Sequence, residues 1–146
     1  VVDPHRLLHL VEGRRGHGVG FCLNVHERPN AFRYRQAQGR MEHMPLHEGN
    51  ITSDEPGIYI EGSHGIRLEN LTLVEKAFQN EFGNFFRLSF LTMVPLDLDA
   101  IDVRLLEPHE LALLNQYHQQ VYATLAQYFS GDKLAWLQHA TREVQL

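Results

Sequence analysis

Residues 53–70 read SDEPGIYIEGSHGIRLEN, a pattern that predicts a β-hairpin. Two isoleucine-containing segments, 58–60 and 66–68, flank a polar turn that contains Gly62. If the strands pair symmetrically about Gly62, Glu55 and Glu69 face each other across an antiparallel pair. Directly opposed residues have Cβ atoms about 4.5–5.5 Å apart, and two carboxylates at that separation repel unless a cation lies between them. The hairpin therefore predicts a metal site.

Upstream of the hairpin, a histidine stands between glycines in the run GHGVG, residues 16–20. Glycine permits unusual backbone angles and close approach of other chain segments, and the apolar residues that follow predict a buried strand over 19–25. One imidazole from His17 and two carboxylates form a ligand set that suits Mn²⁺, with Zn²⁺ or Co²⁺ as alternatives. His26, nine positions further on, is a candidate proton shuttle or oxyanion partner rather than a ligand.

Downstream, the sequence predicts further strands over 70–75 and 85–94, joined by a turn at 80–84. These strands pair most simply as a curved antiparallel sheet. Pro108 is suited to the first turn of a helix, and apolar residues recur after it at spacings of three or four. Asp132 is the expected N-cap of a last short helix, and residues 1–15 form a short helix at most. The fold class is therefore α+β.

Composition excludes several classes of protein. The chain has 146 residues, 43% of them hydrophobic, and a formal net charge of −5 without a basic block, which argues against a nucleic-acid partner. No apolar run approaches the length of a membrane span. The single cysteine, Cys22, rules out an internal disulfide and indicates a cytoplasmic location; in its apolar setting we expect a buried, inert thiol.

The ordered motifs resemble those of a known family. The run from His17 through His26 and Pro29, the DEPG turn at 54–57 and the segment GIRLEN at 65–70 resemble the second half of a pita-bread metallopeptidase, specifically an Xaa-Pro aminopeptidase (aminopeptidase P). The tail from Pro95 resembles the C-terminal extension of that family. The resemblance implies that residues 1–94 form the C-terminal half of the catalytic domain, with an atypical segment over 1–15, and that residues 95–146 form the helical extension.

The resemblance also implies a chemistry. Such enzymes use a dinuclear site, usually with Mn²⁺, whose activated hydroxide cleaves the bond between an N-terminal residue and a following proline. Carried over to this sequence, His17, Glu55 and Glu69 are metal ligands and His26 is a catalytic histidine. Arg67, on the same strand face as Glu69, is expected to orient that carboxylate. The plainer alternatives are a core histidine, surface ion pairs of Glu69 with arginines, and a solvated strand charge for Arg67.

The sequence departs from the family upstream of His17. Two aspartates and another histidine of the complete site lie there in the family, and residues 1–16 do not resemble those strands. Smaller departures are Arg15, Arg28 and Ile58. We therefore expect the 146-residue chain to be weak or inactive alone.

Two functions remain open. One is the catalytic region of a metal-dependent Xaa-Pro aminopeptidase, which acts on peptides with proline at the second position. The other is a non-catalytic pita-bread remnant that binds peptides or a partner. A half sheet exposes a strand edge, so we expect a homodimer or association with the missing N-terminal half.

Overall fold

The computed structural model describes residues 16–22, 25–28, 30–32 and 45–145. The short helix expected within residues 1–15 lies outside this described part. The chain divides into two compact units, Val1–Thr92 and Met93–Leu146, which are described separately below.

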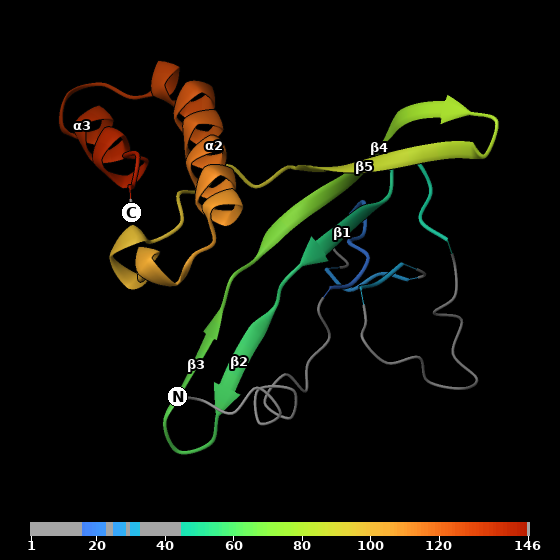
Figure 1. Ribbon diagram of the computed structural model, residues 1–146, viewed down its shortest axis with the longest axis horizontal. Helices are drawn as coiled ribbons and strands as arrows, with labels where there is room; N and C mark the ends of the chain where they lie inside the picture. The colour runs from blue at the N-terminus through green and yellow to red at the C-terminus, as the bar shows by residue number, and fades with distance from the viewer. Residues whose placement is uncertain (1–15, 23–24, 29, 33–44, 146) are drawn as a thin grey trace. The chain divides into compact units, whose positions relative to one another are not determined.

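Five strands form two antiparallel sheets in the described part of the first unit (Figure 1). One sheet has the strand order β1-β4-β5, and the other consists of β2 and β3. The strands are β1 (Ile51–Asp54), β2 (Gly57–Ile60), β3 (His64–Arg67), β4 (Asn70–Asn80) and β5 (Gly83–Phe90).

The hairpin pairings in both sheets are centred on the same residue. Asp54 pairs with Asn70 at the end of the larger sheet, and Gly57 pairs with Arg67 in the smaller one. These pairings are symmetric about Gly62, which has a φ of 71° and so adopts the left-handed conformation that glycine tolerates best. The hairpin predicted from the sequence is therefore confirmed, including its centre.

The strand predicted over residues 19–25 is wrong for the part of it that the structure describes. Among residues 16–22 and 25–28, bridge pairing of this stretch occurs at Gly18, which forms isolated antiparallel bridges with Glu27 and Thr52. The chain turns back at Glu27 onto Gly18, so the described apolar residues between them, Val19, Phe21 and Val25, lie in a loop rather than in a ladder. The thiol of Cys22 is exposed, which corrects the expectation of a buried cysteine.

The strand β5 ends at Phe90, before the predicted end at Val94. Backbone groups after Phe90 are hydrogen-bonded to side chains of α2 instead. The Val94 carbonyl accepts a hydrogen bond from the Tyr117 hydroxyl at 2.8 Å, and the Leu96 amide donates to His118 at 3.0 Å. Because backbone groups must be paired somewhere, these helix side chains replace a continued ladder.

The interior of the larger sheet is partly polar. Val74 is buried on β4, and Thr52, Ser53 and Thr72 are buried beside it. The Thr72 hydroxyl donates to the Thr52 carbonyl at 2.8 Å. Buried hydroxyls are tolerated because they are hydrogen-bonded, so this polar layer joins β1 to β4 by more than the strand ladder.

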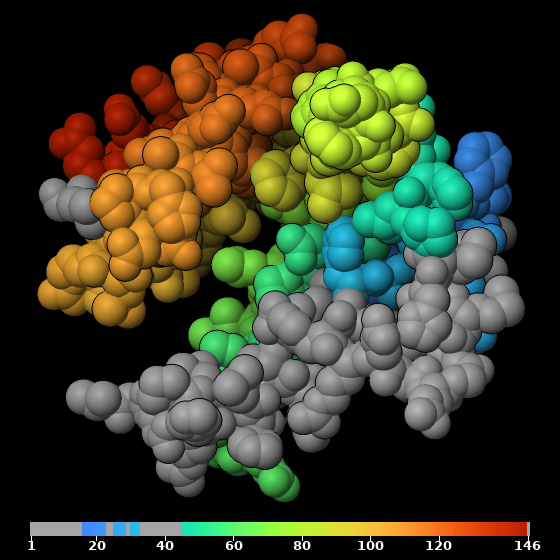
Figure 2. Space-filling model, turned by 45° about the vertical axis from the view of Figure 1, so that its right-hand side comes forward, coloured from blue at the N-terminus to red at the C-terminus, as the bar shows by residue number. Residues whose placement is uncertain are grey.

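The far end of the β4–β5 hairpin is aromatic. The rings of Phe78 and Phe85 stack with their centroids 4.6 Å apart, and Phe82 at the tip of the hairpin is 82% exposed. Figure 2 shows this yellow-green end of the hairpin standing out at the surface. A register shift between Lys76 and Phe78 marks a β-bulge in β4.

The second unit contains two α-helices in its described part, α2 (Pro108–Leu125) and α3 (Gly131–Ala140). As predicted, α2 begins at a proline, which loses no intrahelical hydrogen bond at that position. Short 3₁₀ helices flank them: η1 (Leu98–Ala100), η2 (Val103–Leu105) and η3 (Ala126–Tyr128). Tyr117, Val121 and Leu137 form the core of this unit.

The N-cap of α3 is Ser130, so the prediction of Asp132 as the cap is wrong. Asp132 lies instead in the first turn, where its negative charge interacts favourably with the helix dipole. No helix in the described part of the chain is long and apolar enough to cross a membrane.

His118 connects α2 to the chain that enters the second unit. Its side chain is buried, and its Nε2 atom accepts the hydrogen bond from the Leu96 amide, which requires an unprotonated Nε2. Burial, followed by the positive charge of Arg142, lowers the pKa of His118. Its Nδ1 atom has no hydrogen-bond partner in the described structure.

We therefore expect acid to destabilise the second unit. The unfolded chain takes up a proton near the ordinary imidazole pKa of about 6.5, whereas folded His118 takes one up only at lower pH. The free energy of unfolding should be highest above about pH 6.5 and fall as the pH drops below that value. Urea unfolding followed by circular dichroism between about pH 7 and pH 5 measures the effect. His118→Gln should flatten it and His109→Gln, at an exposed position of α2, should not; an unflattened profile in His118→Gln contradicts this assignment.

Candidate active site

The segment that carries His17 runs antiparallel beside β1. The His17 amide donates to the Ser53 hydroxyl at 2.9 Å, and the Ser53 amide donates to the His17 carbonyl at 2.9 Å. A Cβ atom on Gly16 would lie 1.9 Å from the Ser53 carbonyl oxygen, and one on Gly18 would lie 2.1 Å from the Glu27 carbonyl oxygen. Both positions therefore require glycine, which explains why the histidine stands between two of them.

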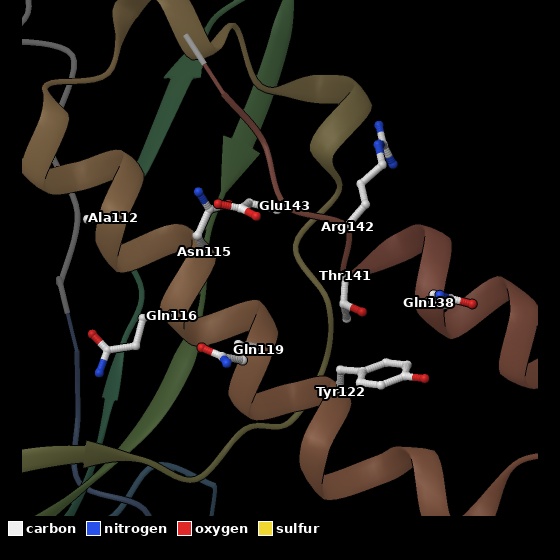
Figure 3. A pocket seen from close by; sticks show the side chains of 9 residues that line it. All are labelled: Ala112, Asn115, Gln116, Gln119, Tyr122, Gln138, Thr141, Arg142 and Glu143. Carbon is white, nitrogen blue, oxygen red and sulfur yellow. The ribbon is translucent and has the colours of Figure 1, made fainter.

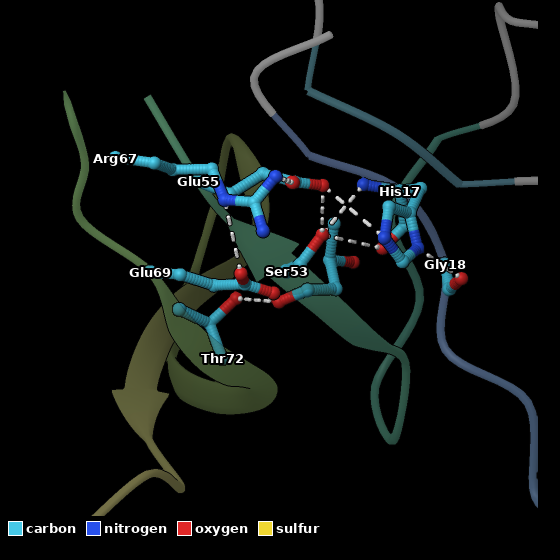
Figure 4. A network of polar contacts seen from close by, with 8 residues as sticks. His17, Gly18, Ser53, Glu55, Arg67, Glu69 and Thr72 are labelled. Carbon is cyan, nitrogen blue, oxygen red and sulfur yellow. Dashed lines mark hydrogen bonds and ion pairs between the residues drawn. The ribbon is translucent and has the colours of Figure 1, made fainter. Parts of the chain in front are cut away.

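The imidazole of His17 is oriented by its own backbone and faces a carboxylate. Its Nδ1 atom donates to the Gly18 carbonyl at 2.9 Å, which leaves Nε2 with a lone pair in the neutral ring. Nε2 lies 3.1 Å from Oε1 of Glu55, and the same oxygen accepts a hydrogen bond from the Ser53 hydroxyl at 3.0 Å (Figure 4). The side chains of His17 and Glu55 are only 11% and 12% exposed.

Arg67 lies between the two glutamates that the hairpin register opposes. Its guanidinium is 3.6 Å from Oε2 of Glu55 and 3.3 Å from Oε2 of Glu69 (Figure 4). The cation that relieves their repulsion is thus present in the protein itself. Repulsion between the glutamates alone therefore does not require a metal, and the contact between His17 and Glu55 is the feature that favours one.

Tyr59 is a member of this cluster that sequence reasoning missed. Its ring lies against Gly57 and Gly65, where added Cβ atoms would approach it to 2.8 Å. Hydrogen bonding to Tyr59 raises the pKa of the Arg67 guanidinium, and Glu69 and Glu55 raise it further. Strand alternation could have revealed it, because residues 57, 59, 65 and 67 share one face of the hairpin.

His26 stacks beside His17 from the loop that returns to Gly18. The two ring centroids are 4.2 Å apart with the planes tilted by 48°, and His26 is exposed. The structure therefore brings three of the predicted site residues together, His17, His26 and Glu55. Glu69 joins them through Arg67 rather than directly.

No group of three or more His, Cys, Asp or Glu side chains with metal-binding geometry occurs among the residues that the structure describes. In this part of the chain the candidate ligands are therefore the contacting pair His17 and Glu55, with the Glu69 carboxylate nearby.

Comparison with protein families identifies the group to which these residues belong. The model of metallopeptidase family M24 matches residues 5–76, and the model of the C-terminal region of the same peptidases matches residues 84–144. The chain belongs to the M24 metallopeptidases.

Fungal proteins are among the relatives of this M24 chain. It is 41% identical over 135 residues to a protein of Sclerotinia sclerotiorum named a probable Xaa-Pro aminopeptidase P, and 42% identical over 131 residues to one of the same name from Sordaria macrospora. These alignments cover 89% and 86% of the chain but only 22% and 21% of the relatives. The M24 chain thus spans about a fifth of the length of the relatives it matches.

A solved structure shares the fold. The X-prolyl aminopeptidase of Caenorhabditis elegans, described as a cytosolic enzyme with a di-nuclear active site, aligns with a TM-score of 0.78 and 33% identity. The alignment covers 96% of this M24 chain and 23% of that enzyme. The expected resemblance to Xaa-Pro aminopeptidases and the α+β, pita-bread fold are therefore confirmed.

A separate pocket in the second unit contains none of the predicted site residues. It has a volume of about 620 Å³ and lies between α2 and the end of α3 (Figure 3). Carboxamide side chains dominate its lining, and one of them, Asn115, exchanges two hydrogen bonds with the backbone of Val144, at 2.9 and 3.0 Å. Asn115, which lines the pocket, thus fixes the backbone at Val144 to α2.

The close packing at Gly16 predicts that this M24 chain does not tolerate a larger residue at that position. Gly16→Ala should separate the His17 segment from β1, because the clash is with backbone and costs about 1–3 kcal/mol to relieve. Hydrogen exchange of the Ser53 amide, which donates to His17, should then lose its protection. Gly49→Ala is the control, since Gly49 has a φ of 85° but open space around it; its backbone strain should leave Ser53 protected. Retained protection in Gly16→Ala would refute the assigned pairing.

Proposed function

We propose that this chain carries part of the active site of a metal-dependent Xaa-Pro aminopeptidase, which hydrolyses the bond between an N-terminal residue and a following proline. The names of the relatives and of the structural neighbour support the reaction class. The observation that carries the proposal is the 3.1 Å contact between Nε2 of His17 and Oε1 of Glu55.

That contact fits two ligands of one ion. In the neutral ring both atoms present lone pairs, so they repel unless a second proton or a cation lies with them. The 3.1 Å separation of these two atoms is compatible with both of them binding one ion. An imidazole nitrogen with carboxylate oxygens suits Mn²⁺, our first assignment, or alternatively Zn²⁺ or Co²⁺.

Glu69 is assigned as the third ligand in this chain. Arg67 engages Oε2 of both glutamates, which is compatible with each carboxylate binding an ion through its other oxygen. Arg67 would thereby fix the two carboxylates in direction, as residues that support metal ligands do. By analogy with the neighbour's di-nuclear site, the complete enzyme would hold two ions with ligands beyond those described here.

The residues have distinct tasks in the proposed reaction. A bound divalent ion supplies Lewis-acid chemistry and lowers the pKa of a bound water. His17 and Glu55 would hold it, and the Ser53 hydroxyl donates a hydrogen bond to the Glu55 carboxylate. His26, exposed beside His17, is placed to hydrogen-bond the substrate carbonyl oxygen and to stabilise the negative charge that develops there.

The remaining assignments follow the same family analogy. We assign residues 1–94 to the catalytic domain and residues 95–146 to its helical extension. The single cysteine and the neighbour's description as cytosolic support a cytoplasmic location.

A binding module without catalysis is the second candidate. It is favoured by the position of Arg67, because a protein cation already neutralises both glutamates. In that case the same residues would bind a peptide or a partner chain without hydrolysis.

Metal binding separates the two candidates. Glu55→Gln keeps the shape of the side chain and removes its charge, so it should weaken Mn²⁺ binding by at least about 100-fold, the upper end of what loss of a supporting residue causes. Calorimetric titration of the purified chain with Mn²⁺ measures this, and Glu61→Gln, on the exposed hairpin turn, is the matched control. Unchanged affinity in Glu55→Gln removes the ligand assignment.

Release of the N-terminal residue from an Xaa-Pro-Xaa peptide is measured in the same samples. Metal-dependent release that is lost in Glu55→Gln supports the peptidase. Mn²⁺ binding without release indicates that ligands outside this chain are needed, whereas peptide binding without Mn²⁺ binding favours the binding module.

Association is a further expectation. The edge strand β5 exposes Phe86, Leu88 and Phe90 by more than 40% each, and such edges are prone to pairing. We expect a homodimer or a complex with the other part of the catalytic domain. Sedimentation of the purified chain at micromolar concentration should give a dimer; a monomer would argue against self-association.

A further inference from the structure

Asn30 is a buried polar residue to which sequence reasoning gave no role. It is 8% exposed. Its side-chain amide donates to the Ile51 carbonyl at 3.0 Å and to the Thr52 hydroxyl, both on β1. Since buried amides are retained where their hydrogen bonds are made, Asn30 is fixed to the sheet.

Asn30 in turn holds Gly18 from two sides. Its backbone carbonyl accepts the Gly18 amide at 2.7 Å. Its side-chain Oδ1 lies 2.5 Å from where a Cβ atom of Gly18 would stand, so the side chain packs directly on the glycine. The backbone of Gly18 is therefore restrained at its amide and at its Cα atom while Asn30 is in place.

Gly18 determines which nitrogen of His17 carries the proton. Its carbonyl accepts the Nδ1 hydrogen bond of His17 at 2.9 Å and also the Glu27 amide at 2.8 Å. The hydrogen bond at one ring nitrogen sets which nitrogen is free to bind a metal. Rotation of the Gly18–Val19 peptide, which contains this carbonyl, would withdraw the acceptor and release the ring.

The anchor of this chain of contacts is rigid. Thr52 is fully buried, and its carbonyl accepts the Thr72 hydroxyl of the central strand β4. The contacts thus run without a gap from β4 through Thr52, Asn30 and Gly18 to the imidazole.

We propose that Asn30 is a positioning residue that locks the Nδ1–H tautomer of His17 and thereby presents Nε2 toward Glu55. The tautomer is a property of the metal-free chain. Its use as a metal ligand rests on the function proposed above.

Nitrogen-15 NMR of the His17 ring, in the metal-free chain at about pH 8, where an ordinary imidazole is neutral, tests the tautomer. The parent should show a proton on Nδ1, whether or not a second proton lies between Nε2 and Glu55. Asn30→Asp keeps the size and removes the amide donors, so the ring should move toward a mixture of the two tautomers. The matched control is Asn115→Asp, because Asn115 also clamps a backbone segment but in the second unit; it should leave His17 unchanged.

Protection of the Val74 amide from hydrogen exchange shows whether the sheet of each variant is folded. If Asn30→Asp unfolds the sheet, the Thr52→Val variant is measured in its place. This substitution removes one hydrogen-bond acceptor of Asn30 and keeps the shape of the threonine side chain. A parental tautomer in the folded variant overturns the proposal, whatever happens to stability or activity.

Mn²⁺ titration of the same variants tests the consequence. Loss of a residue that orients a ligand typically weakens metal binding 10–100-fold, and we expect about that loss in Asn30→Asp. If the parent chain binds no Mn²⁺, the proposed function fails in this chain, while the NMR result still decides the role of Asn30.

Discussion

The antiparallel register about Gly62 is the constraint on which the site depends. Because side chains alternate along a strand, a slip of one residue would turn every side chain of one strand to the other face. Glu55, Arg67 and Glu69 meet only in the observed register. The left-handed turn at Gly62 and the Asp54–Asn70 pairing fix it from opposite ends. The site is thus an outcome of strand pairing more than of any single side-chain contact.

Arg67 changes the electrostatic interpretation of this site. Two carboxylates held by a hairpin are unfavourable unless they are compensated, and a guanidinium with several donors can satisfy both. The protein therefore does not depend on an ion to keep the two strands paired. An ion that binds beside Glu55 would meet carboxylates already oriented, which lowers the reorganisation needed on binding.

The sequence predicted the parts of the structure that local patterns determine. The centre of the hairpin follows from the polar turn that contains Gly62, and the start of α2 follows from Pro108. The loop after Gly18 could not be predicted, because its apolar residues favour a strand while its actual pairing depends on a distant residue, Thr52. The role of Asn30 was missed for a related reason: it packs on Gly18, whose missing side chain leaves room for it, and such a vacancy appears only in three dimensions. Tyr59 could have been found from strand alternation, which places it on the same hairpin face as Arg67.

The bulge in β4 has a consequence for the aromatic end of the hairpin. On β5, Phe85 and Phe86 are adjacent and so point to opposite faces; Phe86 pairs with Lys76 before the register shift, and Phe85 pairs with Phe78 after it. The ribbon therefore displays apolar rings in two directions. A flat partner surface could cover the rings on only one face of the ribbon. Burial of both sets of rings would require a partner that contacts the two faces at once.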